Sequence, residues 1–255
     1  MENAKMKTMV AGLCRDSSCL CAPDAAILLE CAWETERSEE KKALIERRVL
    51  HMKESFDSGA PLCRKTSGIG VFLRGSAAGD SGLHAAIREG VHTAGETLCR
   101  LDAEEEEGDV ALTLYRLPCR FPQCLQTKKL TEESFTDALS GFAAGVITEL
   151  YDTVCTPCIM GVGVGKTEKE AERAAIFAAN VRNIGESGDF PEETALCRRL
   201  SRQINRLRLG SAGLFGNCTA LAVNVKIAKE PKDRLFCSVF VTCHASGRQK
   251  ALIRP

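Results

Sequence analysis

Residues 155–181 read CTPCIMGVGVGKTEKEAERAAIFAANV, the most strongly patterned stretch of the chain. Glycine occupies every second position over Gly161–Gly165. Thr167 and Glu170 then have the spacing of a capping box, which opens an alanine-rich helix to about Val181. We therefore expect a strand, a glycine-rich turn and a helix in succession, an order typical of proteins that mix helices with a sheet.

The glycine-rich turn does not carry a complete nucleotide-binding signature. A phosphate-binding loop needs glycine five positions before its final glycine, and Met160 stands there. Lys166 stands where a dinucleotide fingerprint requires its third glycine. Two interpretations remain open: an ordinary tight turn, or a helix N-terminus whose backbone amides receive an anion.

Hydrophobic periodicity continues the same mixture on both sides of this stretch. Apolar residues recur at helical spacing after Thr131, and again from Pro191 to Gly210, which we expect to be the C′ residue of its helix. Alternation of period two predicts strands elsewhere. The predicted helices cover 82–98, 135–150, 168–181 and 191–210, and the predicted strands cover 69–73, 110–115, 221–227 and 235–242.

No linker divides the chain, whose length suits one large domain or two small ones. The predicted fold class is α/β (mixed α+β), with a mixed sheet flanked by helices in a single compact domain over residues 1–255. Residues 23–60 are the helical N-terminal region of this prediction, and residues 1–22 are expected to be irregular. The acidic run Glu104–Glu107 is interpreted as a solvated loop.

The overall charge excludes some classes of partner. The chain carries 34 basic and 34 acidic side chains in 255 residues, so it has no net field that would attract nucleic acid or an anionic membrane. No apolar run reaches the roughly 18 to 20 residues of a membrane helix, and the first twenty residues lack the apolar core of a signal peptide. We expect a soluble, cytoplasmic protein.

Cysteine is the compositional outlier, with 14 residues in 255. This is below the roughly 8 to 10% that marks a disulfide scaffold, and in a reducing compartment the excess indicates metal binding, redox chemistry or simple burial. Burial is the expected role of four cysteines within patterned helices or strands. They are Cys31, Cys99, Cys197 and Cys237.

One pair of cysteines has the spacing of a metal or redox motif. Cys155 and Cys158 form a CxxC, which supports a zinc or thiol-redox protein as one alternative. A four-cysteine zinc site needs a second pair, and Cys119 with Cys124 is the nearest available.

Three loop-like cysteine segments carry a resemblance. They are PLC at 61–63, CTP at 155–157 and TCHA at 242–245. In this order they resemble the segments P-L-C-Q-D-T-G, C-P-P-x-x-x-G-x-G-x-G-G and C-H-A-A-R-R or C-S-A-D-R-N-x-K of the oxygen-sensitive iron–sulfur hydro-lyases, the class I fumarase and L-tartrate dehydratase α-subunit family. Residues 209–214 and 219–221 are similar to the family's G-L-G-G-K-T-T-A-L.

The resemblance implies a cofactor, a substrate class and a partner. Cys63, Cys155 and Cys243 would ligate a [4Fe–4S] cluster, and three thiolates leave one iron open. An open iron is a Lewis acid that can hold the hydroxyl and carboxylate of a small hydroxydicarboxylate substrate. The family also implies a β-type subunit as partner, homo- or hetero-oligomers, and a cluster that is labile in air.

The chain departs from the family where substrate contacts are expected. The family's Q-D-T-G is replaced by Arg64, Lys65, Thr66 and Ser67, and its characteristic histidine falls on Pro231. These losses keep a second alternative open, in which the chain is a catalytically retired member that serves as an iron–sulfur, structural or interaction module.

Six residues remain as candidates for contacts with a carboxylate substrate. Basic side chains near the ligand cysteines would act as charge-assisted donors. The predicted catalytic residues are Lys65, Arg248 and Lys250, and the predicted substrate-binding residues are Arg64, Thr66 and Gly163.

Overall fold

The computed structural model describes most of the chain, in two compact units. Unit 1 comprises Met1–Leu20, Cys63–Phe121 and Ser246–Pro255, and unit 2 comprises Cys21–Leu62 and Pro122–Ala245. We describe each unit by itself. The described residues are 3–16, 37–57, 66–118, 121, 123–130, 135–151, 154, 156–183, 185–210, 218–228, 236–243 and 248–253.

Unit 1 is a four-stranded mixed sheet in the order β2-β1-β3-β8. β1 pairs parallel with β2 and antiparallel with β3, and β3 pairs antiparallel with β8. The helices α1 and α4 contact each other and share one apolar cluster with the sheet. The bounds are α1 Asn3–Asp16, β1 Thr66–Arg74, α4 Ser81–Thr93, β2 Leu98–Glu104, β3 Val110–Pro118 and β8 Arg248–Ile253.

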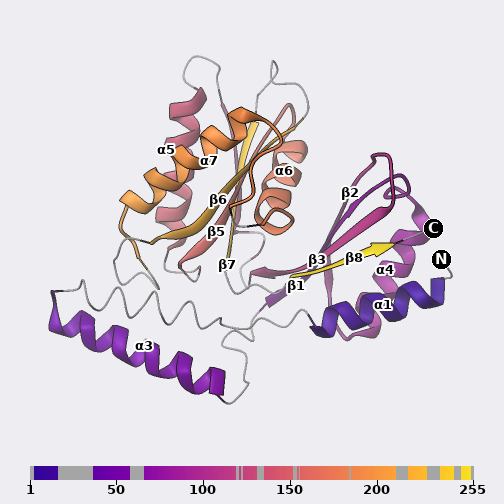
Figure 1. Cartoon of the computed structure of the whole chain (residues 1–255), viewed down its shortest axis with the longest axis horizontal. Coiled ribbons are helices and arrows are strands. Elements are labelled where there is room, and N and C mark those ends of the chain that lie inside the picture. Colours follow the sequence, from indigo (N-terminus) through magenta and orange to yellow (C-terminus); the bar gives the residue numbers. More distant parts are fainter. Residues whose placement is uncertain are drawn as a thin grey trace. The chain divides into compact units, whose positions relative to one another are not determined.

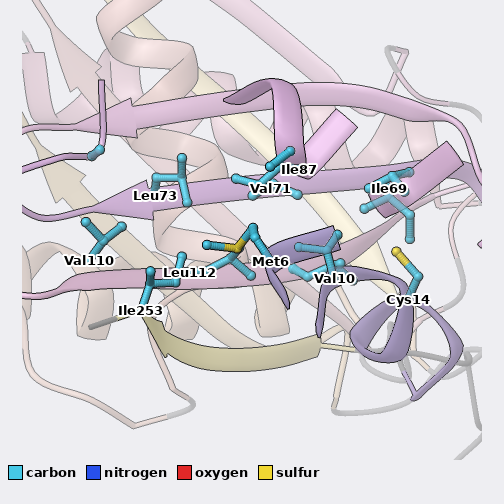
Figure 2. Close-up of a cluster of buried hydrophobic side chains, with 14 residues drawn as sticks. Met6, Val10, Cys14, Ile69, Val71, Leu73, Ile87, Val110, Leu112 and Ile253 are labelled. Atoms are coloured by element: carbon cyan, nitrogen blue, oxygen red, sulfur yellow. The ribbon is translucent and has the colours of Figure 1, made fainter. Parts of the chain in front are cut away.

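The core of unit 1 lies between these helices and one face of the sheet (Figure 2). Ile69, Val71 and Leu73 share one face of β1 because side chains alternate along a strand, and all three are fully buried in this cluster. α4 begins at the N-cap Asp80, whose carboxylate accepts a hydrogen bond of 2.6 Å from Leu83 N.

The N-terminus corrects one expectation. Residues 1–22 were expected to be irregular, but α1 occupies Asn3–Asp16. Met6, Val10 and Cys14 recur at helical spacing on α1 and are buried in the unit 1 core. This stripe is short and mixed with polar residues, so its helical role becomes visible only beside the sheet that it covers.

Unit 2 contains a second four-stranded sheet, in the order β4-β7-β5-β6. β7 pairs antiparallel with β4 and β5, and β5 pairs parallel with β6. Figure 1 shows α5 and α7 on one face of this sheet and α6 on the other. The bounds are α3 Glu39–Asp57, β4 Leu125–Lys129, α5 Phe135–Leu150, β5 Cys158–Gly165, α6 Glu168–Asn180, α7 Pro191–Arg206, β6 Ala220–Ile227 and β7 Phe236–Cys243.

The glycine-rich segment belongs to a strand, which corrects the turn that the sequence predicted. Gly161, Gly163 and Gly165 lie within β5 and are buried. A Cβ at Gly163 would overlap the carbonyl oxygen of Ala171 on α6, and one at Gly161 would overlap that of Ala175. The glycines therefore let the helix backbone pack directly on the strand.

The amides at the start of α6 are used by the chain itself. Thr167 is the N-cap, and its hydroxyl accepts a hydrogen bond of 3.2 Å from Glu170 N. The carboxylate of Glu170 accepts one of 3.0 Å from Lys166 N. The capping residues are those that the sequence predicted, and both bonds occupy donors that an anion would need.

The predicted mixed α/β class is confirmed, with differences at several boundaries. α7 starts at Pro191 as expected but ends at Arg206, before Gly210, and Arg208 already has a positive φ of 54°. The predicted helix over 82–98 ends at Thr93, and the strands β2, β4 and β8 were not predicted. Glu104 ends β2, so the acidic loop is shorter than expected.

The single-domain prediction over residues 1–255 stays a prediction. α3 lies within the expected helical region 23–60, and residues 23–36 and 58–60 are outside the described residues.

Candidate functional site

Four cysteines gather at one end of the unit 2 sheet, which we call the thiol end. β4, β5 and β6 begin at this end, and β7, which runs antiparallel to β4 and β5, finishes there. The thiol end therefore collects one cysteine within two residues of a terminus of each strand, although these residues are far apart in sequence. They are Cys124, Cys158, Cys218 and Cys243.

The register pairs Cys158 on β5 directly with Cys243 on β7. Cys158 N donates a hydrogen bond of 3.1 Å to Thr219 O, on the β6 side of the strand. Because the N–H and C=O of one residue point to the same side of a strand, Cys158 turns its backbone groups away from β7. Cys158 and Cys243 are thus a non-hydrogen-bonded pair, the kind in which the Cα atoms lie about 4.5 Å apart.

Of the three predicted ligands, Cys243 is the one that the described residues include. It is half-buried at the last position of β7. Cys155 precedes Cys158 by three residues, so the chain can carry its Cα at most about 11 Å from that of Cys158. Cys63 lies, like Cys155, outside the described residues.

Burial changes the chemistry of the other thiols at this end. Burial raises the pKa of Cys158 to about 12, with a smaller contribution from the negative charge of Cys218. Burial likewise raises the pKa of the half-buried Cys218. In the chain without a metal, the Cys158 thiol therefore keeps its proton at neutral pH.

The cysteines that were expected only to pack have different surroundings. Cys237 is fully buried and Cys197 is half-buried, with its sulfur accepting from Val225 N at 3.1 Å. Cys99 lies in β2, as its pattern indicated, but its side chain is exposed. Cys31 lies outside the described residues.

Two of the predicted catalytic residues lie on β8 of unit 1. Arg248 and Lys250 are two positions apart and pair with Tyr115 and Thr113 of β3, so both belong to one face of the sheet. Arg248 is half-buried, and this burial lowers the pKa of its guanidinium. Lys250 is exposed.

The remaining predicted residues are not brought together by the described chain. Thr66 is the first residue of β1, and Arg64 and Lys65 lie outside the described residues. Gly163 is buried beneath α6. The space that a Cβ of Gly163 would occupy is filled by the α6 backbone, so Gly163 serves helix packing there, and its substrate contact stays a prediction.

A polar row that sequence reasoning missed crosses the unit 1 sheet beside Arg248. Arg100, Gly70, Tyr115 and Arg248 are successive partners across β2, β1, β3 and β8. The absent side chain of Gly70 leaves room for the Tyr115 ring, which a Cβ there would overlap. Burial raises the pKa of Tyr115, and the charge of Asp102 raises it further.

The hydroxyl of Tyr115 is buried, and the described part of the chain offers it no hydrogen-bond partner. Such a group costs free energy unless something satisfies it. The alternation of β3 is the one signal of this row in the sequence, but that pattern cannot show which strands lie beside it.

Among the described residues, no set of three or more His, Cys, Asp or Glu side chains is arranged to hold a metal ion. No helix in the described ranges has both the length and the apolar character needed to cross a bilayer.

The thiol end and the order of its strands fall within the part of the chain that matches a known family. The sequence model of the family described as Fumarate hydratase (Fumerase) matches residues 123–252, which include all of β4, β5, β6 and β7. The chain therefore belongs to the fumarate hydratase family of hydro-lyases.

Within this family the chain is similar to L(+)-tartrate dehydratase alpha subunits. It is 26% identical over 274 residues to the "Putative L(+)-tartrate dehydratase subunit alpha" of Methanocaldococcus jannaschii, with 96% of each chain covered. It is 25% identical over 152 residues to the L(+)-tartrate dehydratase subunit alpha of Escherichia coli K12, which covers 59% of this chain and 48% of that protein.

Proposed function

We propose that this chain is the α-type subunit of a [4Fe–4S]-dependent hydro-lyase that adds water to, or removes it from, a small hydroxydicarboxylate. Membership of the fumarate hydratase family and the similarity to tartrate dehydratase alpha subunits support the reaction class. The observation that carries the proposal is Cys243, a half-buried thiol at the end of β7.

The proposed ligands are Cys63, Cys155 and Cys243. Thiolates are the ligands that iron–sulfur clusters use, and Cys243 is half-buried at the end of β7. The donor chemistry therefore fits a cluster. When bound, the cluster would supply an open iron as a Lewis acid for a hydroxyl and a carboxylate.

The chain's own side chains would hold and orient the substrate. Arg248 would bind a carboxylate through a charge-assisted pair of hydrogen bonds, and its partial burial would strengthen that contact by reducing competition from water. Lys250, Arg64, Lys65 and Thr66 remain further proposed contacts. We expect a β-type subunit to contribute acid–base groups, and we expect the assembly to be cytoplasmic.

Anaerobic metal analysis tests the cluster. The full chain, purified without oxygen with a β-type partner, is expected to contain about four irons with matching sulfide, and Cys243→Ala is expected to lose most of them. Cys218→Ala is the matched control, since Cys218 lies at the same thiol end and is not a proposed ligand. Full retention of iron in Cys243→Ala would contradict the ligand assignment.

Steady-state kinetics test the substrate contacts. With tartrate, malate and fumarate as trial substrates, Arg248→Met is expected to lower kcat/KM by about 10- to 100-fold, as losing a hydrogen bond to a charged group costs about 1.5–3 kcal/mol. Arg199→Met removes an exposed ion pair with Asp137 and is expected to leave kcat/KM unchanged. A protein that holds iron but acts on none of these acids would favour a retired family member.

A further inference from the structure

Cys158 has no part in the proposed cluster, yet it is the register partner of Cys243, one of the proposed ligands. The two residues are direct partners in the antiparallel ladder of β5 and β7. The hydrogen bond from Cys158 N to Thr219 O makes them a non-hydrogen-bonded pair.

The backbone geometry of such a pair suits a disulfide. Cα atoms in non-hydrogen-bonded pairs lie about 4.5 Å apart, and their side chains share one face of the sheet. Disulfides span Cα separations of about 4.4–6.8 Å. The two sulfurs can therefore meet without a shift in the register of either strand.

The two thiols also differ in access. Cys243 is half-buried and keeps part of its surface exposed to solvent, whereas Cys158 is fully buried. An oxidant thus reaches Cys243 first, and the neighbouring sulfur of Cys158 lies inside the sheet, protected from reagents in solution.

We propose that Cys158 is the resolving thiol of Cys243, and that a small disulfide such as oxidised glutathione joins the two in a cross-strand disulfide. The sulfur of Cys243 attacks glutathione disulfide, forms a mixed disulfide and releases one glutathione thiolate. The sulfur of Cys158 then attacks Cys243 Sγ and releases the second. Two protein thiols are oxidised to one disulfide, one glutathione disulfide is reduced to two glutathiones, and the two protons pass to the glutathione thiolates.

The consequence for catalysis rests on the proposed function. The disulfide withdraws Cys243 from the proposed ligand set in a form that a dithiol can reverse, and it prevents oxidation of the ligand to the irreversible sulfinic acid. The Cys158–Cys243 disulfide would therefore prevent the chain from binding the cluster until the disulfide is reduced.

Peptide mapping tests the pair on the wild-type chain. The iron-free full-length protein is treated with oxidised glutathione, blocked with an alkylating reagent and digested. We expect a dominant linked peptide that joins Cys158 to Cys243, and the loss of both thiols from alkylation. A Cys243 that links mainly to Cys155 or Cys218, or that ends as a stable glutathione adduct, would overturn the proposal.

Two variants separate a resolving role from general damage. In Cys158→Ala, Cys243 is expected to accumulate as the glutathione adduct. Cys237→Ala removes another buried thiol of β7, whose partner on β5 is Val164, and is expected to leave the link unchanged. Circular dichroism verifies that both variants fold, and the wild-type map decides the matter if either does not.

Iron content distinguishes this inference from the proposed function. A chain that forms the link but binds no iron would refute the cluster and leave the disulfide standing. A chain that loads iron but never forms the link would refute the resolving role alone. In the expected case, the oxidised wild type takes up iron only after reduction by a dithiol, whereas the glutathione adduct of Cys158→Ala also yields to glutathione itself.

Discussion

In unit 1, α1 and α4 meet their sheet through branched and long side chains, whereas in unit 2 α6 meets β5 backbone to backbone. Leu73 and Ile87 are both fully buried in the first interface (Figure 2). In the interface between α6 and β5, Gly161 and Gly163 contribute no side chain, and the α6 residues that pack on them are mainly alanines.

The two interfaces tolerate different kinds of substitution. An interface of interdigitating side chains loses stability when an atom is removed, because a cavity remains. An interface of two close backbones has no spare volume and loses stability when an atom is added. The two units should thus respond oppositely to small-to-large and large-to-small substitutions.

Gly163→Ala is expected to have the largest effect. The added Cβ overlaps the backbone oxygen of Ala171, which cannot move without shifting α6, so a loss of more than about 4 kcal/mol is expected. Hydrogen exchange of the β5 amides would measure it. Gly141→Ala is the control, since nothing lies within 4 Å of a Cβ on this α5 residue, and it should be neutral or stabilising. Equal effects of the two substitutions would contradict the backbone contact.

Leu73→Ala is expected to be the next largest. Leu73 is fully buried in the unit 1 core, and removing its side chain should cost about 2–5 kcal/mol. Exchange of β1 amides measures this loss, and the unit 2 amides should be unaffected. Leu252→Ala, on an exposed side chain of the same sheet, should change stability by less than about 0.5 kcal/mol.

Alkaline pH should lower the stability of both units, starting from different pH values. Burial raises the pKa of Cys158 to about 12 from 9.0, and also raises the pKa of Cys237. The folded state therefore holds protons that the unfolded state releases, so this stability is present below pH 9.0 and falls as the pH rises toward the folded-state values, by at most about 1.4 kcal/mol per pH unit for each thiol.

Urea unfolding at a series of pH values tests the sign. Cys237→Ala removes the contribution of one buried thiol to the pH dependence, so the free energy of unfolding should fall less steeply with pH than in the wild type. In unit 1, Tyr115 is a buried group whose pKa is likewise raised, from 10.0. The loss of stability that Tyr115 causes should therefore begin about one pH unit higher than the loss caused by the thiols. A wild type that gained stability above pH 9 would refute the burial of these thiols.

Removing the helix caps should give the smallest effects. Thr167→Ala on α6 and Asp80→Ala on α4 each remove one side-chain acceptor at a helix N-terminus, at an expected cost of about 1 kcal/mol. Thr167→Ser and Asp80→Asn keep the acceptor and should restore most of the stability. If Thr167→Ala also speeded hydrogen exchange of the β5 amides, the N-cap and the close packing of α6 on β5 would be coupled.

Particular residues show how far the sequence reached. Thr167 and Glu170 predicted the start of α6, and Pro191 predicted that of α7, because capping and proline preferences act within one turn of chain. The glycines over Gly161–Gly165 were misassigned to a turn. Glycine signals the absence of a side chain, and local sequence cannot say whether a turn or a neighbouring helix requires that absence.

For the candidate site too, the sequence predicted features of single segments but not contacts between segments. Family motifs identified Cys243 as a candidate ligand, and these motifs are sequence information. The sequence did not predict the neighbours of Cys243 and Arg248. It placed Cys158 in a CxxC with Cys155, and it did not indicate that Tyr115 lies beside Arg248. A spacing along the chain describes contacts within one segment, and these contacts join different segments.

Local preferences and motifs in the amino-acid sequence were enough to predict the family of this protein, its mixture of helices and strands and the starts of its best helices. Three features appeared only in the folded structure. Cys158 is the register partner of Cys243, the glycines of β5 let the α6 backbone pack directly on the strand, and Tyr115 is the register partner of Arg248. Each depends on the register of strands distant in the chain, and register is set by the fit of whole faces and not by any short stretch of residues.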